Sequence, residues 1–199
     1  TPISFQERRL CPRYWLIDPL DGTKEFLKKN DEFTINIALI DQHKPILGVI
    51  FAPALDVCYL AEDTKGAFKQ IAQNRPQPLH SRAWEEGSTI TAAVSRRHGM
   101  NALKIFLAQF EHLNLLHCGS ALKFCFLAEG LADIYPRFSP TFEWDTAAGQ
   151  CILEQAGGAI IDYKGKPLRY NMSSSLQKIA FLAVADKSHF LLNYLKASI

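Results

Sequence analysis

The stretch that decides the fold is Trp15-Leu16-Ile17-Asp18-Pro19-Leu20-Asp21-Gly22-Thr23. It predicts an apolar strand that runs into a tight acidic loop. Asp18 and Asp21 place two carboxylates three residues apart, and Pro19 between them fixes one φ angle. The Leu20 carbonyl can point into the same space, and Gly22 allows a ligand to approach the backbone closely. Carboxylate and carbonyl oxygens suit Mg²⁺ rather than zinc. Taken alone, however, such a loop is more often an acidic turn with capping aspartates.

A second motif, Trp144-Asp145-Thr146-Ala147-Ala148-Gly149, places an acid at the start of a helix of small residues. Small residues let the helix pack closely, and a helix start offers free N–H groups to an anion. A lone aspartate there is most often an N-cap. Beside the acidic loop, Asp145 becomes a candidate third metal ligand.

The two motifs together resemble the two signatures of the inositol monophosphatase superfamily, and the resemblance extends over essentially the whole chain. It implies a Mg²⁺-dependent, lithium-sensitive phosphatase of α+β class, a layered αβαβα sandwich shared with sugar phosphatases. Two or more Mg²⁺ ions are implied, with Asp18, the Leu20 carbonyl, Asp21 and Asp145 as ligands. Thr23 would position the attacking water, and the N–H groups of Gly22 and Thr23 would cradle phosphate.

Three further segments resemble the 3′(2′),5′-bisphosphate nucleotidase branch of that superfamily: Lys24-Glu25-Phe26, Gly119–Cys125 and Tyr135–Phe138. The substrate implied is adenosine 3′,5′-bisphosphate, hydrolysed to AMP and phosphate in sulfur assimilation or nucleotide detoxification. Two phosphates need cationic partners beyond the metals. Lys123 and Arg137 could supply that charge. The resemblance implies substrate contacts from Leu20, Asp21, Gly22, Thr23, Ser120, Lys123, Arg137, Asp145 and His98. For His98, which ends the run Ser95-Arg96-Arg97-His98, a surface role is equally expected.

Period-2 alternation and turn residues predict an antiparallel meander in the first half. Its strands are expected at Tyr14–Asp18, Phe33–Leu39, Pro45–Ala52, Val57–Leu60 and Ala67–Lys69. Residues 70–88 are expected to form a surface connection, which divides 1–88, with the acidic loop, from 89–199, with the substrate residues. Together the two parts would make one family domain.

The second part alternates strand and helix patterns. Strands are expected at Thr89–Ser95, Leu131–Tyr135, Ala159–Tyr163 and Lys178–Ala185. Helices are expected around Leu103–Phe110 and at Ser120–Glu129, Asp145–Ala156 and Ser188–Leu195.

The chain departs from the family pattern in one respect. The family uses a further glutamate as a ligand of the first metal and an acidic partner for the threonine, both upstream of Thr1. Glu7, the nearest acid, lies among Gln6, Arg8 and Arg9 and does not match. We therefore expect the C-terminal portion of a longer enzyme, without the N-terminal helices. Two alternatives stay open: the same chemistry on inositol monophosphate, and an inactive fragment that binds a phosphorylated ligand.

Composition excludes several other classes of protein. The net charge of +2, from 22 basic and 20 acidic residues, is low for a protein that binds nucleic acid. The partner that the resemblance implies is a small phosphorylated nucleotide. The longest apolar run, Ile179–Ala185, is too short to span a bilayer. The five scattered cysteines lack a C-x-x-C pair and predict reduced thiols. A cytoplasmic protein is expected, with attachment to the cytoplasmic face of the inner membrane as an alternative. The sequence does not indicate an oligomeric state.

Overall fold

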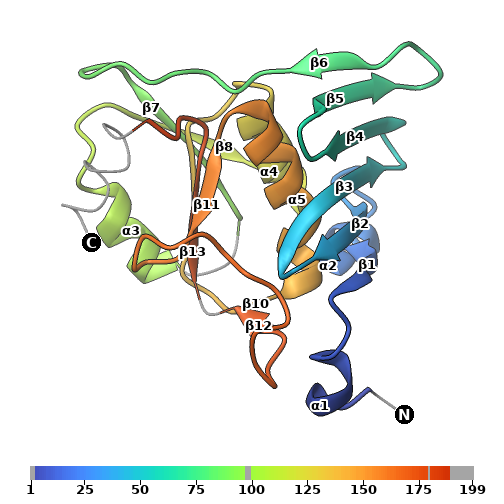
Figure 1. The fold of residues 1–199 in the computed structure, drawn as a ribbon. Helices are drawn as coiled ribbons and strands as arrows, with labels where there is room; N and C mark the ends of the chain where they lie inside the picture. Colours follow the sequence, from blue (N-terminus) through green and yellow to red (C-terminus); the bar gives the residue numbers. More distant parts are fainter. Residues whose placement is uncertain (1–2, 97–99, 179, 189–199) are drawn as a thin grey trace.

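The alternating apolar residues of the first half form a six-stranded antiparallel sheet with strand order β1-β2-β3-β4-β5-β6 (Figure 1). The computed structural model describes residues 3–96, 100–178 and 180–188. The strands are β1 Arg13–Asp21, β2 Thr34–Asp41, β3 Lys44–Ala52, β4 Val57–Glu62, β5 Gly66–Ile71 and β6 Gln77–Leu79. The predicted meander is thus confirmed.

The prediction that residues 70–88 form only a connection is wrong at one point. This segment contributes β6, which pairs with β5 at the edge of the sheet. Pro78 lies in β6, where an edge position tolerates the missing N–H. Two short helices were not predicted, α1 Phe5–Arg8 and α2 Thr23–Leu27.

The second half builds a five-stranded mixed sheet with the order β11-β13-β9-β7-β8. Its strands are β7 Ile90–Val94, β8 Leu113–His117, β9 Ile134–Arg137, β11 Ala159–Ile161 and β13 Phe181–Val184. The helices are α3 Met100–Leu107, α4 Leu122–Ala128 and α5 Glu143–Ala156, and a separate two-stranded ladder joins β10 Thr141–Phe142 to β12 Gln177–Lys178. The strands predicted at Thr89–Ser95 and Ala159–Tyr163 are confirmed as β7 and β11, and the helices predicted at Ser120–Glu129 and Asp145–Ala156 as α4 and α5, with bounds that differ by a few residues. Strands β8 and β10 were missed, β9 begins at Ile134, later than expected, and α3 lies earlier than the predicted Leu103–Phe110. The single strand predicted over Lys178–Ala185 is wrong, because Lys178 lies in β12 of the two-stranded ladder and β13 of the mixed sheet begins at Phe181. The helix predicted over Ser188–Leu195 lies, beyond Ser188, outside the described residues.

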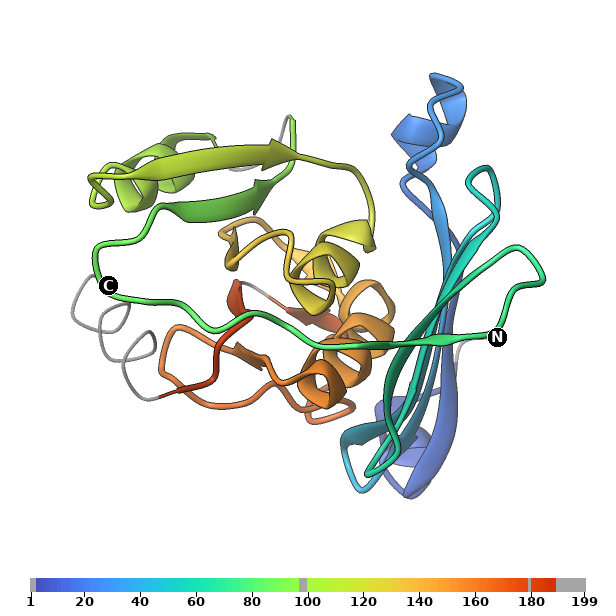
Figure 2. The same cartoon turned by 90° about the horizontal axis from the view of Figure 1, so that it is seen from above.

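Helices α4 and α5 lie between the two sheets (Figure 2). Their side chains share one core with inward residues of both sheets, such as Ile50 of β3 and Ala183 of β13. Helix α3 packs on the opposite face of the mixed sheet, against residues such as Ala92 and Leu182. The described residues therefore form alternating sheet and helix layers, the expected α+β architecture. The division at residue 88 stays a prediction.

The five cysteines are free thiols, and three of them are buried: Cys118, Cys125 and Cys151. Within the described ranges, no helix has the length and apolar content needed to cross a membrane.

Candidate active site

The acidic loop is formed by the last residues of β1. The pairing of β1 with β2 is regular up to Asp18 and shifts before Asp21, so the strand bulges at Pro19 and Leu20. The Leu20 N–H donates to Asp18 Oδ1 at 3.0 Å, and Asn36 Nδ2 on β2 donates to Asp21 Oδ2 at 3.4 Å. These contacts orient both carboxylates toward the start of α5.

Asp145 faces that loop from helix α5. The helix begins at Glu143, two residues earlier than predicted, so Asp145 lies within its first turn rather than at its start. Thr141 Oγ1 donates to Asp145 Oδ2 at 2.5 Å, and the Phe142 N–H donates to the same oxygen at 2.9 Å. These two contacts fix the Asp145 carboxylate in the first turn of the helix.

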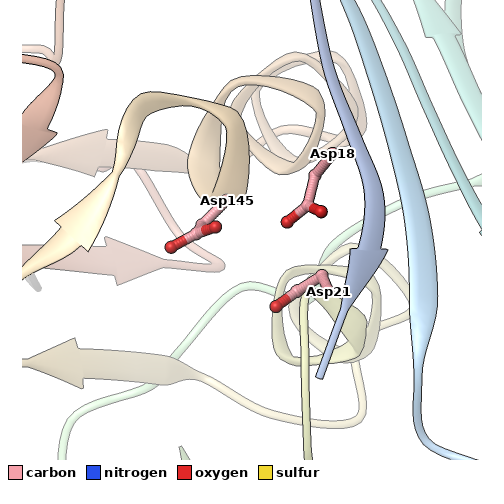
Figure 3. Close-up of side chains that lie close together, drawn as sticks. All are labelled: Asp18, Asp21 and Asp145. Atoms are coloured by element: carbon pink, nitrogen blue, oxygen red, sulfur yellow. The ribbon is translucent and has the colours of Figure 1, made fainter. Parts of the chain in front are cut away.

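The three aspartates form one cluster, in which one carboxylate oxygen from each lies within 4.8 Å of the others (Figure 3). Asp18 is buried, and its pKa is raised to about 6. Burial is the largest cause, and the negative charges of Asp21 and Asp145 add to it. Burial and the charge of Asp145 also raise the pKa of Asp21, whereas the positive charges of Lys123 and Arg137 lower it. Hard oxygen donors that repel one another at this range fit a divalent cation. Among the described residues, this is the one group of three such side chains placed to hold a metal ion.

Leu20 and Thr23 lie next to this cluster in the chain. Gly22 has a φ of +81°, which a glycine adopts readily, and the chain then enters α2 at Thr23. Thr23 is exposed, and its hydroxyl lies 3.5 Å from the Leu20 carbonyl oxygen. The loop therefore brings the expected carbonyl ligand and the expected water-positioning hydroxyl side by side.

A cavity of about 320 Å³ opens beside the cluster. Asp21 and Asp145 line it together with Gly22, Thr23, Ser120, Lys123 and Arg137, so the structure brings most of the predicted site residues to one space. His98 lies outside the described residues.

Lys123 and Arg137 supply positive charge to the cavity wall. Lys123 is 2% exposed, and its Nζ donates to the carbonyls of Ser120 at 2.6 Å and Cys118 at 3.3 Å. The Tyr135 hydroxyl accepts from Arg137 Nη1 at 3.1 Å, and the buried Arg137 Nε finds no acceptor among the described groups. Both cations are held in place and have capacity for an anion.

Ser120 lies between these cations and the acidic loop. Its φ is +46°, and its buried hydroxyl has no hydrogen-bond partner among the described groups. A Cβ added to Gly22 would lie 3.2 Å from the Cβ of Ser120, so a side chain at position 22 would crowd this contact.

Sequence reasoning missed Glu32. Its carboxylate pairs with both terminal nitrogens of Arg96 and accepts the Gly119 N–H at 2.7 Å. The pair joins the loop before β2 to the segments after β7 and β8 at the cavity. The contacts lie 64 and 87 residues apart in the chain, and no local pattern marks them.

Glu7 takes no part in the cluster, in keeping with its mismatch to the family pattern. It accepts hydrogen bonds from the N–H and hydroxyl of Ser4 and forms a capping box for α1.

Comparison with known proteins settles the family. The protein-family model described as "Inositol monophosphatase family" matches residues 6–188 of this chain. The chain belongs to the inositol monophosphatase family. It is 44% identical over 186 residues to the 3′(2′),5′-bisphosphate nucleotidase CysQ of Escherichia coli strain K12, an alignment that covers 90% of this chain and 71% of that protein. The CysQ of Haemophilus influenzae is 37% identical over 188 residues, with 94% and 69% covered.

A solved structure gives the same result. The crystal structure of CysQ from Bacteroides thetaiotaomicron, a bacterial member of the inositol monophosphatase family, superposes with a TM-score of 0.84 at 33% identity. The match covers 94% of this chain and 75% of that one.

Proposed function

We propose that this family member is a Mg²⁺-dependent phosphomonoesterase that hydrolyses adenosine 3′,5′-bisphosphate to AMP and phosphate. The observation that carries the proposal is the three-aspartate cluster at the edge of a cavity walled by Lys123 and Arg137. The relatives named 3′(2′),5′-bisphosphate nucleotidase support the choice of substrate. A role in sulfate assimilation follows from the same relationship.

The carboxylates of Asp18, Asp21 and Asp145 would hold the metal ions together with the Leu20 carbonyl. Bound Mg²⁺ would supply Lewis-acid polarisation of the phosphoryl oxygens and a more acidic water. Thr23 would orient the attacking water. That water's oxygen bonds to phosphorus while the bond from phosphorus to the 3′ oxygen breaks. One proton of the water ends on the leaving 3′ oxygen, which becomes the ribose hydroxyl, and the other stays on the released phosphate.

The basic wall of the cavity would hold the nucleotide. The N–H groups of Gly22 and Thr23 would bind the reacting phosphate at the end of the acidic loop. Lys123 and Arg137 would bind phosphate oxygens. The Ser120 hydroxyl, which has no partner among the described groups, would donate to phosphate or ribose. A doubly phosphorylated ligand fits this wall better than a singly phosphorylated one because the buried Lys123 and the half-buried Arg137 can then each have an anionic partner.

The cytoplasm is the proposed location. The free thiols agree with a reducing compartment. The comparisons give no support to attachment at a membrane face, and we do not propose it.

The test is phosphate release from adenosine 3′,5′-bisphosphate, AMP and inositol 1-phosphate, each with Mg²⁺ and with EDTA. We expect Mg²⁺-dependent release from the bisphosphate above the other two. Asp21→Asn should abolish it, whereas Asp56→Asn, an exposed aspartate whose φ of +51° asparagine tolerates, should not. Faster release from inositol 1-phosphate would favour the other family substrate. Binding without release would show a ligand-binding chain instead of an enzyme.

A further inference from the structure

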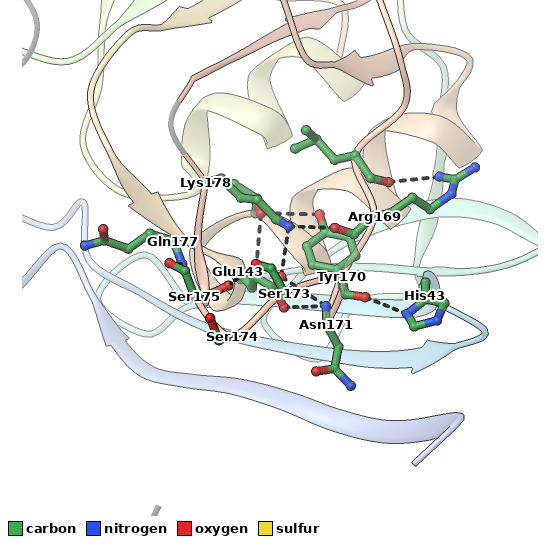
Figure 4. A network of polar contacts seen from close by, with 12 residues as sticks. His43, Glu143, Arg169, Tyr170, Asn171, Ser173, Ser174, Ser175, Gln177 and Lys178 are labelled. Carbon is green, nitrogen blue, oxygen red and sulfur yellow. Dashed lines mark hydrogen bonds and ion pairs between the residues drawn. The ribbon is translucent and has the colours of Figure 1, made fainter. Parts of the chain in front are cut away.

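A buried charged network lies behind the first turn of α5 (Figure 4). Glu143, the first residue of the helix, has a side chain that is 0% exposed. Lys178 Nζ lies 2.9 Å from Glu143 Oε1 and also donates to the Arg169 carbonyl at 2.7 Å. A carboxylate buried this completely is tolerated only when it is paired and hydrogen-bonded, so Glu143 is held in one position.

The loop that follows β11 supplies the other partners of Glu143. The Asn171 N–H lies 3.0 Å from Oε1 and 2.9 Å from Oε2 of that carboxylate. Arg8 fixes this loop from outside, because it donates to Asn171 Oδ1 and to the carbonyls of Ser173 at 2.8 Å and Ser174 at 2.7 Å. One segment, residues 171–178, therefore supplies the partners of the first residue of α5, and Arg8 near the start of the chain holds that segment.

The same network reaches the groups that orient Asp145. In the ladder of β10 and β12, Thr141 is paired with Lys178, and the Glu143 N–H donates to the Leu176 carbonyl at 2.9 Å. Thr141 and Phe142, which form β10, are the two residues that donate to Asp145 Oδ2. Lys178 thus fixes both the strand that holds Asp145 and the helix that carries it.

We propose that Glu143 and Lys178 are positioning residues that hold Asp145 in its metal-ligating geometry. The inference rests on the proposed function, since it takes a divalent cation to bind at Asp18, Asp21 and Asp145. The pair acts through Asp145, and groups that orient a metal ligand commonly change metal affinity about 10–100-fold when they are replaced.

A long-range charge effect of the pair predicts a different result. The two explanations can be separated by whether each substitution weakens or strengthens cation binding. If only the electric field of the pair mattered, removing the negative Glu143 would weaken cation binding and removing the positive Lys178 would strengthen it. If the pair positions Asp145, both removals weaken binding.

The experiment measures Mn²⁺ binding to the whole chain by the loss of the free Mn²⁺ signal in electron paramagnetic resonance, with Mg²⁺ as competitor. The variants are Glu143→Gln, Lys178→Met, the double variant and the control Glu154→Gln. Glu154 lies on the same helix and accepts from Gln150 Nε2 at 2.8 Å, nine residues beyond Asp145. We expect each single variant to bind Mn²⁺ about 10-fold more weakly and the control to match wild type.

Thermal unfolding of the same proteins separates positioning from stability. The double variant buries no unpaired charge, so its melting temperature should exceed those of the single variants while its Mn²⁺ affinity stays low. Tighter binding by Lys178→Met, or recovery of wild-type affinity in the double variant, would overturn the inference alone. A wild-type chain that binds no Mn²⁺ would overturn the proposed function and this inference with it.

Discussion

At the scale of single residues, the site places a group of negative side chains beside a group of positive ones. Asp18, Asp21 and Asp145 face one another, and the cations of Lys123 and Arg137 lie on the wall of the same cavity. Burial and mutual repulsion raise the pKa of Asp18 and of Asp21, while the two cations act against the rise at Asp21. A cation relieves the repulsion among the acids, and phosphate satisfies the bases, so metal and substrate stabilise the same arrangement from two sides.

The raised pKa of Asp18 predicts a pH-dependent stability in EDTA. Burial and the neighbouring acids raise this pKa from 3.8 to about 6, so the folded chain binds the proton more tightly than the unfolded chain. This contribution is present below about pH 4 and lost as the pH rises through about 6. At 1.36 kcal/mol per unit, it amounts to at most about 3 kcal/mol.

Urea denaturation of wild type and Asp18→Asn between pH 4 and 7 measures it. The difference between their free energies of unfolding should change by this amount across that range, whereas Asp56→Asn should follow wild type. Parallel curves for wild type and Asp18→Asn would contradict the raised pKa.

Lys123 predicts a selective loss of substrate binding. Methionine is close in length and apolar, so Lys123→Met should keep the packing against the Tyr135 ring, whose centroid lies 5.0 Å from Nζ, and remove the charge. Lost ground-state binding raises KM more than it lowers kcat. We expect KM for the bisphosphate to rise about 10-fold, the effect of about 1.4 kcal/mol.

Steady-state kinetics of phosphate release checks this expectation. Lys65→Met, at a side chain that is 66% exposed, is the matched control and should leave KM unchanged. An unaltered KM in Lys123→Met would remove Lys123 from the substrate pocket.

At the scale of helices and strands, the elements with a regular local sequence pattern were predicted and those without one were missed. Strict alternation over Phe33–Leu39 predicted β2, and small residues after Asp145 predicted a closely packed helix. Strand β8, Leu113–His117, was missed because its sequence does not alternate, and β6 was missed because Pro78 is typical of a connection.

The two acidic motifs predicted the cluster of Asp18, Asp21 and Asp145, but not the groups that support it. Glu32 with Gly119, and Glu143 with Asn171, are paired across 87 and 28 residues. Such pairs depend on how sheets and helices pack together, and neither glutamate lies in a periodic pattern that points to its partner.

Helix α5 packs directly against Gly48 of β3. A Cβ there would lie 2.5 Å from the Ala148 carbonyl oxygen and 2.9 Å from the Cys151 Cβ. Gly48→Ala must therefore push the helix outward, and we expect a loss of about 3 kcal/mol in the free energy of unfolding, the upper end for overpacking. Because α5 carries Asp145, Mn²⁺ binding should weaken as well.

Urea denaturation measures that loss, with Gly87→Ala as the control. No heavy atom lies within 4 Å of a Cβ at Gly87, where only the φ of +81° opposes alanine, so we expect about 1 kcal/mol there. Equal losses at both positions would show that α5 adjusts freely over β3.

At the scale of the whole molecule, the meander sheet has two unequal faces. Helices α4 and α5 cover one face, and no described helix covers the other (Figure 2). On that outer face the register aligns one apolar row across five strands: Ile17, Ile37, Val49, Leu60 and Phe68. Trp15 and Ile17 on the edge strand β1 are 55% and 53% exposed.

This outer face predicts that the chain self-associates. Contiguous apolar surface of this kind favours contact between molecules, and an edge strand adds unpaired backbone groups to it. Sedimentation velocity over a wide range of protein concentration should show a rising sedimentation coefficient for wild type. The double variant Trp15→Thr with Ile17→Thr keeps residues that favour a strand and should remain monomeric, with Mn²⁺ binding unchanged. The control is Ile105→Gln, at a 72% exposed side chain on α3, the helix that packs on the other sheet, and it should behave as wild type. If wild type itself stays monomeric at every concentration, the half-buried row is too well shielded by its own strands to drive association.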